Sequence, residues 1–228
     1  MFPFRFDSSV GPASLAPYMA LPEPAVASVS ATAATADLIE RARSGEVAAF
    51  RAIYTRHRGD VARLVHRMMG PAPDAEDVLQ EVFFQVHKSL KDFRGQSKFT
   101  TWLHRVTVNV VLMHRRAAKS RPVLAEELPS DIAGDRRGLL PDEDADRRTR
   151  TRAFLGLLDK LGEKKRTVFV LHDLEGVSPQ EIAEIVEAPV LTVRTRLFYA
   201  RREIEAMISQ EPALAELGAL AVIDKGDQ

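Results

Sequence analysis

Arginines, a threonine and two aromatic residues near the carboxyl end of the chain have the side-chain types that read duplex DNA. A guanidinium group donates paired hydrogen bonds to a guanine edge or binds phosphate, and a methyl group or a ring can contact thymine. The segment from Leu191 to Ile208 is predicted to be a helix, because apolar residues recur in it at helical spacing. These inward residues are Val193, Leu197, Ala200 and Ile204. The outer side carries Arg194, Thr195, Arg196, Phe198, Tyr199 and Arg202, and a helix with such a face suits the major groove.

A second, shorter helix is predicted just before this one and would hold it in place. Ser178 can cap its amino end, Pro179 suits its first turn, and Glu181 completes a capping box. Pro189 cannot continue that helix, so the chain must turn before the next one begins. Two helices with a tight turn between them predict a helix-turn-helix. Taken alone, the segment also fits a small helical domain with an ordinary solvated basic face.

A basic run with interleaved aromatic residues lies in the first half of the chain. From Lys88 to Arg121 there are nine Lys and Arg residues against one acid, a net charge of +8. Rings can stack on unpaired bases while cations hold the backbone, which is the chemistry of single-strand binding. The aromatic residues are Phe93, Phe99 and Trp102, and the polar candidates on the following helix are Lys98, Arg105, Asn109, Arg115 and Arg116. At least one of the three rings is expected in the core, because Trp102 shares helical spacing with Val106 and Val110.

A polar stripe with one aromatic residue precedes this run. Asp74 is predicted to cap a helix whose buried side holds Leu79, Val82, Phe83, Val86 and Leu90. The other side carries Asp77, Gln80, Glu81 and Phe84 at helical spacing. A polar stripe by itself is most simply a solvated surface. A phenylalanine inside an acidic rim is typical of a partner surface, and the acids favour a basic partner helix over DNA.

The charges are segregated along the chain, although 32 basic and 32 acidic residues give a net charge of zero. Residues 122–146 hold two arginines against eight acids, a net of −6, and residues 147–210 hold twelve basic against nine acidic residues, a net of +3. Helical periodicity without a strand pattern predicts an all-α protein of two small helical domains, residues 37–121 and 147–210, joined by an acidic flexible linker, residues 122–146. Residues 1–36 are predicted to be a disordered extension, and residues 211–228 form a tail with the composition of a short apolar helix.

Several classes of protein are disfavoured by composition. The chain has no cysteine, which excludes disulfide bonds and thiolate metal sites, and a cytoplasmic location is expected. No apolar run reaches the ~20 residues that span a bilayer, so no membrane insertion is expected. There is no Gly-x-x-x-x-Gly-Lys-Ser/Thr phosphate loop and no His-Glu-x-x-His motif, and the six histidines show no pairing typical of a metal site. Neither a cofactor nor enzymatic activity is expected.

Three motifs follow one another in a specific order. They are Asp77-Val78-Leu79-Gln80-Glu81-Val82-Phe83, then Phe99-Thr100-Thr101-Trp102-Leu103 with Asn109, and then Glu181-Ile182-Ala183 with Thr192-Val193-Arg194-Thr195-Arg196. In this order and spacing, which cover residues 37–208, the chain resembles the extracytoplasmic-function sigma factors of bacterial RNA polymerase. The resemblance implies a two-domain initiation factor whose partners are core RNA polymerase, promoter DNA and an anti-sigma factor.

The resemblance also implies a role for each surface. Asp77, Gln80, Glu81 and Phe84 would bind the clamp helices of the largest polymerase subunit, with the flap as a further polymerase contact. The minus-10 element would be melted and bound by Arg94, Gln96, Ser97, Lys98, Phe99, Trp102, Arg105, Asn109, Arg115 and Arg116. The minus-35 duplex would be read by Thr192, Arg194, Thr195, Arg196, Phe198, Tyr199 and Arg202. A flipped base, whose extrusion costs a few kcal/mol, would sit in the loop from Arg94 to Ser97. The acidic linker would thread the basic RNA path of the polymerase.

The sequence departs from the family pattern at a few positions, so promoter specificity cannot be copied from a relative. Leu191 stands where the family usually has glycine, Tyr199 where a basic residue is common, Gly162 for a frequent proline and Met113 for a common aspartate. A free-standing helix-turn-helix regulator would explain the carboxyl-terminal motif equally well, but neither the basic aromatic run nor the acidic stripe. A pure interaction adaptor would have no use for the +8 charge around Trp102.

Overall fold

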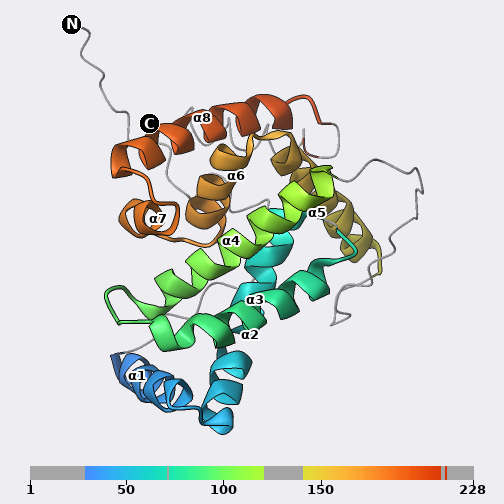
Figure 1. Ribbon diagram of the computed structural model, residues 1–228. Helices are drawn as coiled ribbons and strands as arrows, with labels where there is room; N and C mark the ends of the chain where they lie inside the picture. Colours follow the sequence, from blue (N-terminus) through green and yellow to red (C-terminus); the bar gives the residue numbers. More distant parts are fainter. Residues whose placement is uncertain (1–28, 71, 121–140, 212–213, 215–228) are drawn as a thin grey trace, which may run out of the picture.

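The computed structural model describes residues 29–70, 72–120, 141–211 and 214, and within these ranges every regular element is helical (Figure 1). The first half contains α1 (Val29–Arg43), α2 (Val47–Met69), α3 (Ala75–Ser89), the 3-10 turn η2 (Leu90–Asp92) and α4 (Phe99–Ser120). The second half contains α5 (Pro141–Lys160), α6 (Glu163–Phe169), the wider turn η3 (Val170–Leu174), α7 (Pro179–Ile185) and α8 (Val190–Ile208). The predicted all-α fold is confirmed.

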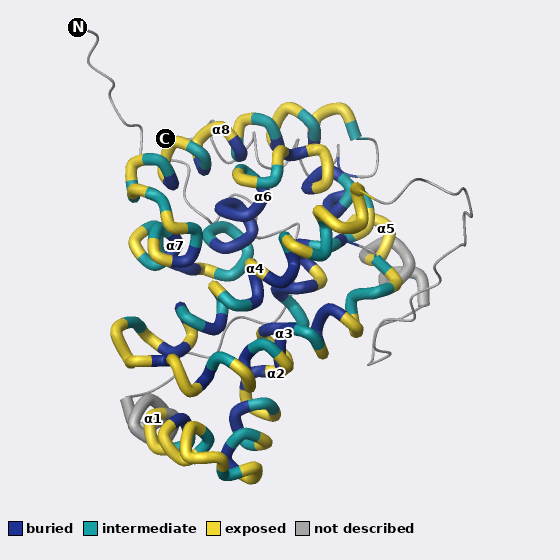
Figure 2. The backbone as a smooth tube through the Cα atoms, viewed as in Figure 1, coloured by how far each residue is buried: buried dark blue, intermediate teal, exposed yellow. Residues whose placement is uncertain are grey.

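Helices α2, α3 and α4 pack against one another because each has one apolar side. The stripe predicted on α3 is buried together with Leu90, and the α2 residues Val61, Leu64, Val65 and Met68 are buried opposite it. Figure 2 shows the result as dark blue inner sides and yellow outer sides along these helices. Helix α1 packs across α2 and also meets η2. This three-helix core fixes both the acidic stripe of α3 and the basic run of α4.

Asp74 occupies the position before α3 as predicted, but its side chain makes no capping hydrogen bond. Its Oδ2 instead lies 3.2 Å from Nδ1 of His114 on α4. The prediction of a side-chain cap was therefore wrong, because a partner brought close by the fold competes with the local amide for the same carboxylate. Glu76 and Asp77 still stand in the first turn of α3, where the helix dipole favours carboxylates.

The second half forms around the helix-turn-helix, whose local chemistry matches the sequence prediction. The amide of Glu181 donates to Ser178 Oγ at 3.3 Å, and Glu181 Oε2 accepts from the Ser178 amide at 3.3 Å, so the capping box is present. The turn that follows contains Glu187, whose φ of 50° lies in the left-handed region. Helix α8 then buries the four residues predicted to face inward. Leu155, Leu158 and Leu161 of the preceding segment are also buried.

Between α6 and α7 the helix widens for one turn at η3. The amide of Glu175 donates to the carbonyl of Val170, five residues back, at 3.0 Å. Such a π-type turn places one extra residue in the helical ring and occurs mostly as a single turn. The carbonyl of Leu174 and the side chain of Glu175 lie at its end and meet the first half of the chain.

Some predicted boundaries differ from the observed ones. Helix α1 begins at Val29, inside the stretch predicted to be a disordered extension, and α5 begins at Pro141, inside the predicted linker. Residues 121–140 and most of the tail lie outside the described residues. Leu214, which is described, is buried and belongs to the apolar core cluster.

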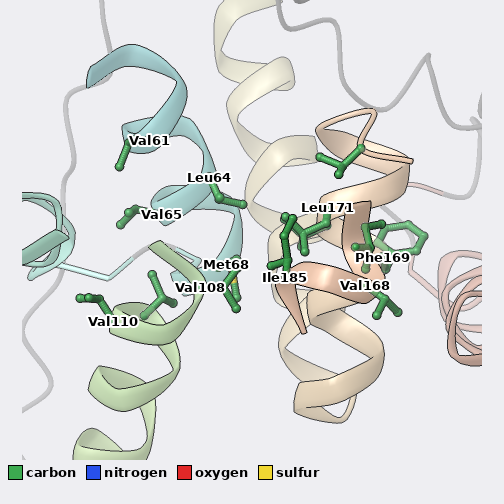
Figure 3. Packing of buried hydrophobic residues seen from close by; sticks show 14 of the residues in the cluster. Val61, Leu64, Val65, Met68, Val108, Val110, Val168, Phe169, Leu171 and Ile185 are labelled. Atoms are coloured by element: carbon green, nitrogen blue, oxygen red, sulfur yellow. The ribbon is translucent and has the colours of Figure 1, made fainter. Parts of the chain in front are cut away.

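The two modules, residues 29–120 and 141–211, pack directly against each other. Helix α4 contacts α7, and α2 contacts η3. The buried apolar residues of both modules form one continuous cluster, and Figure 3 shows Leu64 and Met68 of α2 facing Leu171 and Ile185 of the second module. The sequence analysis predicted two domains joined by a flexible linker and did not predict that the domains would pack against each other.

Candidate nucleic-acid interface

Helix α8 presents its predicted reading face to solvent, because its opposite side is packed on α6, α7 and α5. Arg194, Thr195 and Arg202 are exposed, and about half of the surface of Phe198 (51%) and Tyr199 (52%) is open. Thr192 and Arg196 lie at the edge of the face and are partly buried. Two half-exposed aromatic rings beside three arginines are unusual for a surface that meets only water.

The side chains of this face are partly organised by one another. The Phe198 and Tyr199 rings meet edge to face with centroids 5.4 Å apart, and the Arg202 guanidinium carbon lies 5.8 Å from the Phe198 centroid. Cation–π contact of this kind orients a guanidinium group. Thr195 Oγ1 donates to the Leu191 carbonyl at 2.9 Å, so its hydroxyl hydrogen is used within the helix. Its methyl group and the remaining oxygen lone pair are what Thr195 can offer to a base edge.

The acidic stripe on α3 is also open to solvent. Asp77, Gln80 and Phe84 are exposed, Phe84 to 60%, and Glu81 is half-buried. Glu81 Oε1 accepts a hydrogen bond from Gln85 Nε2 at 2.7 Å, whereas Asp77 forms no ion pair with any described residue. The stripe thus presents the Asp77 carboxylate, free of ion pairs with described residues, and the Phe84 ring, on a helix whose other side is packed in the core.

The aromatic residues of the basic run form a cluster at the start of α4. Phe93 and Phe99 are buried, and their ring centroids lie 5.3 and 5.6 Å from that of the half-buried Trp102. Phe99 therefore packs as a support beneath Trp102, with His57 on its other side at 5.4 Å. Arg94, Gln96 and Asn109 are exposed and Ser97 is partly exposed. A hollow of about 510 Å³ opens there, lined by Gln96, Ser97, Trp102 and Arg105 and walled by α7 and its following turn.

Four basic residues predicted to hold DNA are occupied by carboxylates of the second module. Lys98 Nζ lies 2.9 Å from Glu181 Oε1, and Arg116 Nη2 lies 2.8 Å from Glu163 Oε1. Arg115 Nη1 lies 3.1 Å from Asp159 Oδ1, and Arg105 pairs with Glu187. The Lys98 ammonium lowers the pKa of Glu181 below its ordinary value, although partial burial opposes this. All four contacts cross from α4 or its preceding loop to the other module.

Buried polar groups accompany these surface pairs. Arg67 on α2 and Glu175 beyond η3 are each only 6% exposed, with Nη1 and Oε1 2.7 Å apart, and Arg67 also donates to the Leu174 carbonyl. Arg166 on α6 pairs with Asp159 and donates to the Arg67 carbonyl at 3.3 Å. Burial lowers the pKa of Arg67 and raises that of Glu175, while their mutual attraction opposes both shifts. Sequence reasoning missed this buried polar contact between the modules, which we call the seam. The residues that meet across it lie about a hundred positions apart and follow no periodic pattern.

Within the described ranges, no three potential ligands are close enough to hold a metal ion. None of the helices there combines the length and the apolar composition needed to cross a membrane.

Comparisons with known proteins agree with the two-module layout. Residues 53–121 match the family described as Sigma-70 region 2, and residues 151–204 match Sigma-70, region 4. The chain is 36% identical over 177 residues to the ECF RNA polymerase sigma-E factor of Haemophilus influenzae, covering 75% of this chain and 93% of that protein.

Two solved structures share the fold. One is CnrH in complex with the cytosolic domain of CnrY, with a TM-score of 0.58 and 24% identity, covering 78% of this chain and 99% of that one. The other is the sigma factor RpoE in complex with the anti-sigma factor NepR from Bartonella quintana, with a TM-score of 0.56 and 18% identity, covering 70% and 96%.

Proposed function

The chain belongs to the extracytoplasmic-function family of sigma factors, and from this premise we propose how its separate surfaces divide the work of transcription initiation. It acts as an alternative sigma factor, which directs core RNA polymerase to promoters. Residues 37–121 are the module for the polymerase and the minus-10 element, residues 147–210 are the module for the minus-35 element, and residues 122–146 connect them. Bond making belongs to the polymerase, because a sigma factor is an initiation factor.

The acidic stripe of α3 is the proposed polymerase surface. Asp77, Gln80, Glu81 and Phe84 would meet basic clamp helices of the largest polymerase subunit, with the flap contacting the second module. Support comes from the stripe itself: Asp77 forms no ion pair with any described residue, and Phe84 is 60% exposed. A central apolar anchor within a polar rim is the usual anatomy of a protein interface.

The loop before α4 and the outer side of α4 are the proposed minus-10 surface. Gln96 and Ser97 border the hollow beside Trp102, which has room for an unstacked base. Arg94 and Asn109 are exposed further candidates on the loop and on α4. A base can stack on the half-buried Trp102 ring, whose position is supported from below by Phe93 and Phe99. Lys98, Arg105, Arg115 and Arg116 would hold the strand through its phosphates.

Helix α8 is the proposed reading element for the minus-35 duplex. Arg194, Thr195, Arg196, Phe198, Tyr199 and Arg202 are the candidates, with Thr192 at the helix start. The observation that carries the whole proposal is that one chain combines this reading face with a separate, unpaired acidic stripe. A free-standing regulator needs only the first.

The decisive experiment measures binding of the purified full chain to bacterial core RNA polymerase. We expect tight binding by the wild type and loss of binding in the Asp77→Ala, Gln80→Ala double variant, whose melting temperature should match the wild type because both residues are exposed. Gln180→Ala, an exposed change on the other module, is the matched control and should bind like the wild type. No binding by the folded wild type, together with tight binding to duplex DNA without polymerase, would favour the free-standing regulator.

An anti-sigma factor is a further proposed partner. The support is by likeness only: a protein that shares this fold is described in complex with the anti-sigma factor NepR. We infer that such a regulator would act by covering the acidic stripe or helix α8.

A further inference from the structure

The proposed function leaves one property of the basic face of the first module unexplained, namely its pairing with acids of the second module. We use this term for Lys98, Arg105, Arg115 and Arg116, the four cations that would hold the minus-10 strand. Each of them pairs with a carboxylate of the second module, namely Glu181, Glu187, Asp159 and Glu163. Every cation of the basic face therefore faces an acid of the same chain, while the side chains of Lys98 and Arg116 stay 76% and 66% exposed at its rim.

These carboxylates pair with the same groups that would hold phosphates. Backbone phosphates bind proteins mostly through lysine and arginine, and the strength of that binding comes from charge neutralisation. A guanidinium or ammonium group that already faces a carboxylate at 2.8–3.1 Å must give up that partner before it can hold a phosphate. In addition, α7 and its following turn form one wall of the hollow beside Trp102, where an unstacked base would have to enter.

The contact is specific. Arg67 and Arg166 are almost fully buried where the modules meet, and their partners include Glu175, the Leu174 carbonyl and the Arg67 carbonyl. Arg115 adds a hydrogen bond to the Met68 carbonyl at 2.9 Å, which fixes it next to Asp159. Buried charges that find partners only in one relative placement define that placement, because a shifted one would leave them unpaired.

The other two functional surfaces remain open in the same arrangement. The acidic stripe on α3 and the reading face of α8 are exposed, including Phe84, Phe198 and Tyr199. The docked arrangement thus covers the proposed single-strand surface and leaves the proposed polymerase and duplex surfaces accessible.

We propose that the free chain masks its own minus-10 surface: the carboxylates of the second module sit on the basic face as substitutes for phosphates until the two modules separate. This rests on the proposed function, since the basic face is the surface assigned to the minus-10 strand. The masked state is compatible with the first encounter with polymerase or with minus-35 duplex. It is incompatible with holding a melted strand.

Glu187 offers the sharpest test because it pairs with Arg105 and is itself exposed. Glu187→Arg replaces attraction to Arg105 with repulsion and should favour separated modules. Glu184→Arg makes the same change of charge on the same side of the cavity, and Glu184 forms no ion pair with any described residue, so it is the matched control. Glu187→Gly removes the pair and suits the left-handed φ of 50°, so it tests the same contact in a turn that remains well folded.

Two measurements on the full chain test whether the second module covers the basic face. Because the chain has no cysteine, Val47→Cys and Leu191→Cys can carry spin labels at exposed sites on the two modules, and the distance between them reports docking. Binding of a short fluorescent thymidine oligonucleotide reports access to the basic face. We expect a short, narrow distance in the wild type, and in Glu187→Arg a longer distance with about fivefold tighter oligonucleotide binding than in Glu184→Arg. Glu187→Gly should change both readouts in the same direction by less.

Three outcomes would overturn the proposal. These are a long, broad distance in the wild-type chain, equal oligonucleotide binding by Glu187→Arg and Glu184→Arg, and separation of the modules without any gain in binding. Transcription by holoenzyme containing Arg105→Ala distinguishes the two levels of inference. If that variant is defective while one of the three outcomes holds, the minus-10 assignment stands and only the masking fails. If that variant is fully active, the assignment itself is wrong.

Discussion

Glu175→Gln, which breaks the buried ion pair with Arg67, is the most informative perturbation of the seam. The two side chains are each 6% exposed, and the two charged atoms lie 2.7 Å apart. Removal of one partner of a buried pair typically costs about 3–5 kcal/mol, because the other charge stays buried without compensation. Arg67 already has an Nε without a hydrogen-bond partner among the described residues, so it has little to replace the lost carboxylate.

The measured loss has an upper limit set by the fold. Arg67 and Glu175 belong to different modules, so separation of the modules would let water hydrate the abandoned guanidinium group. The loss of stability in Glu175→Gln therefore cannot exceed the free energy by which the modules dock. We expect the free energy of unfolding to fall by about 1–5 kcal/mol. If the loss is smaller than the roughly 3–5 kcal/mol typical of an unpaired buried charge, it measures the free energy of docking between the modules.

A double-mutant cycle separates the pair from its surroundings. Urea unfolding of wild type, Arg67→Met, Glu175→Gln and the double variant should give a coupling energy of at least about 1 kcal/mol, since groups in contact usually couple by 0.5–3 kcal/mol. The double variant should be less damaged than the sum of the single ones, because no charge is left unpaired at the site. A coupling below about 0.5 kcal/mol would refute the reasoning and show that the two residues do not meet in solution.

Three further predictions concern reading, folding and pH. Arg194→Ala should weaken promoter use by about 1–3 kcal/mol if the guanidinium reads a base, and equal losses on every promoter sequence in binding assays would show a phosphate contact instead. Ser178→Ala should cost about 1 kcal/mol in thermal or urea unfolding by removing the capping box, while Ser178→Thr, which keeps the hydroxyl, should cost little. Burial lowers the pKa of His57 and His104, so both favour the fold while neutral; stability should be full above pH 6.5 and should fall on acidification, by at most about 1.4 kcal/mol per pH unit for each histidine. His57→Leu should flatten this pH dependence, and an unchanged slope in unfolding experiments would contradict the assignment.

Much of each module could be predicted from the sequence, because local rules govern it. Apolar spacing located the buried sides of α3 and α8, and the capping box at Ser178 formed with both hydrogen bonds. The acidic stripe and the reading face were expected to be exposed for the same reason: a helix that buries one side must show the other. Periodicity identifies faces reliably when the helix is long and its two sides differ in polarity.

Contacts between distant segments could not be predicted in this way. Asp74 had the right position for a cap, yet its carboxylate turned to His114, which only the fold brings near. The pairing of Lys98 with Glu181 links residues 83 positions apart, and a single sequence offers no rule that selects one glutamate among many. The charge totals show that both modules are net basic. They could not show that acids of the second module face cations of the first.

The wide turn η3 determines the direction in which Glu175 points. A regular helix advances about 100° per residue, so the one additional residue in this turn rotates everything after it by about that angle. Without it, the Leu174 carbonyl and the Glu175 carboxylate would face away from Arg67, and α7 and α8, which follow the turn, would also lose their placement against α6. The length of this single turn therefore sets two contacts at once: a deletion of one residue between 170 and 174 would disturb both the buried Arg67–Glu175 pair and the packing of α8 on α6.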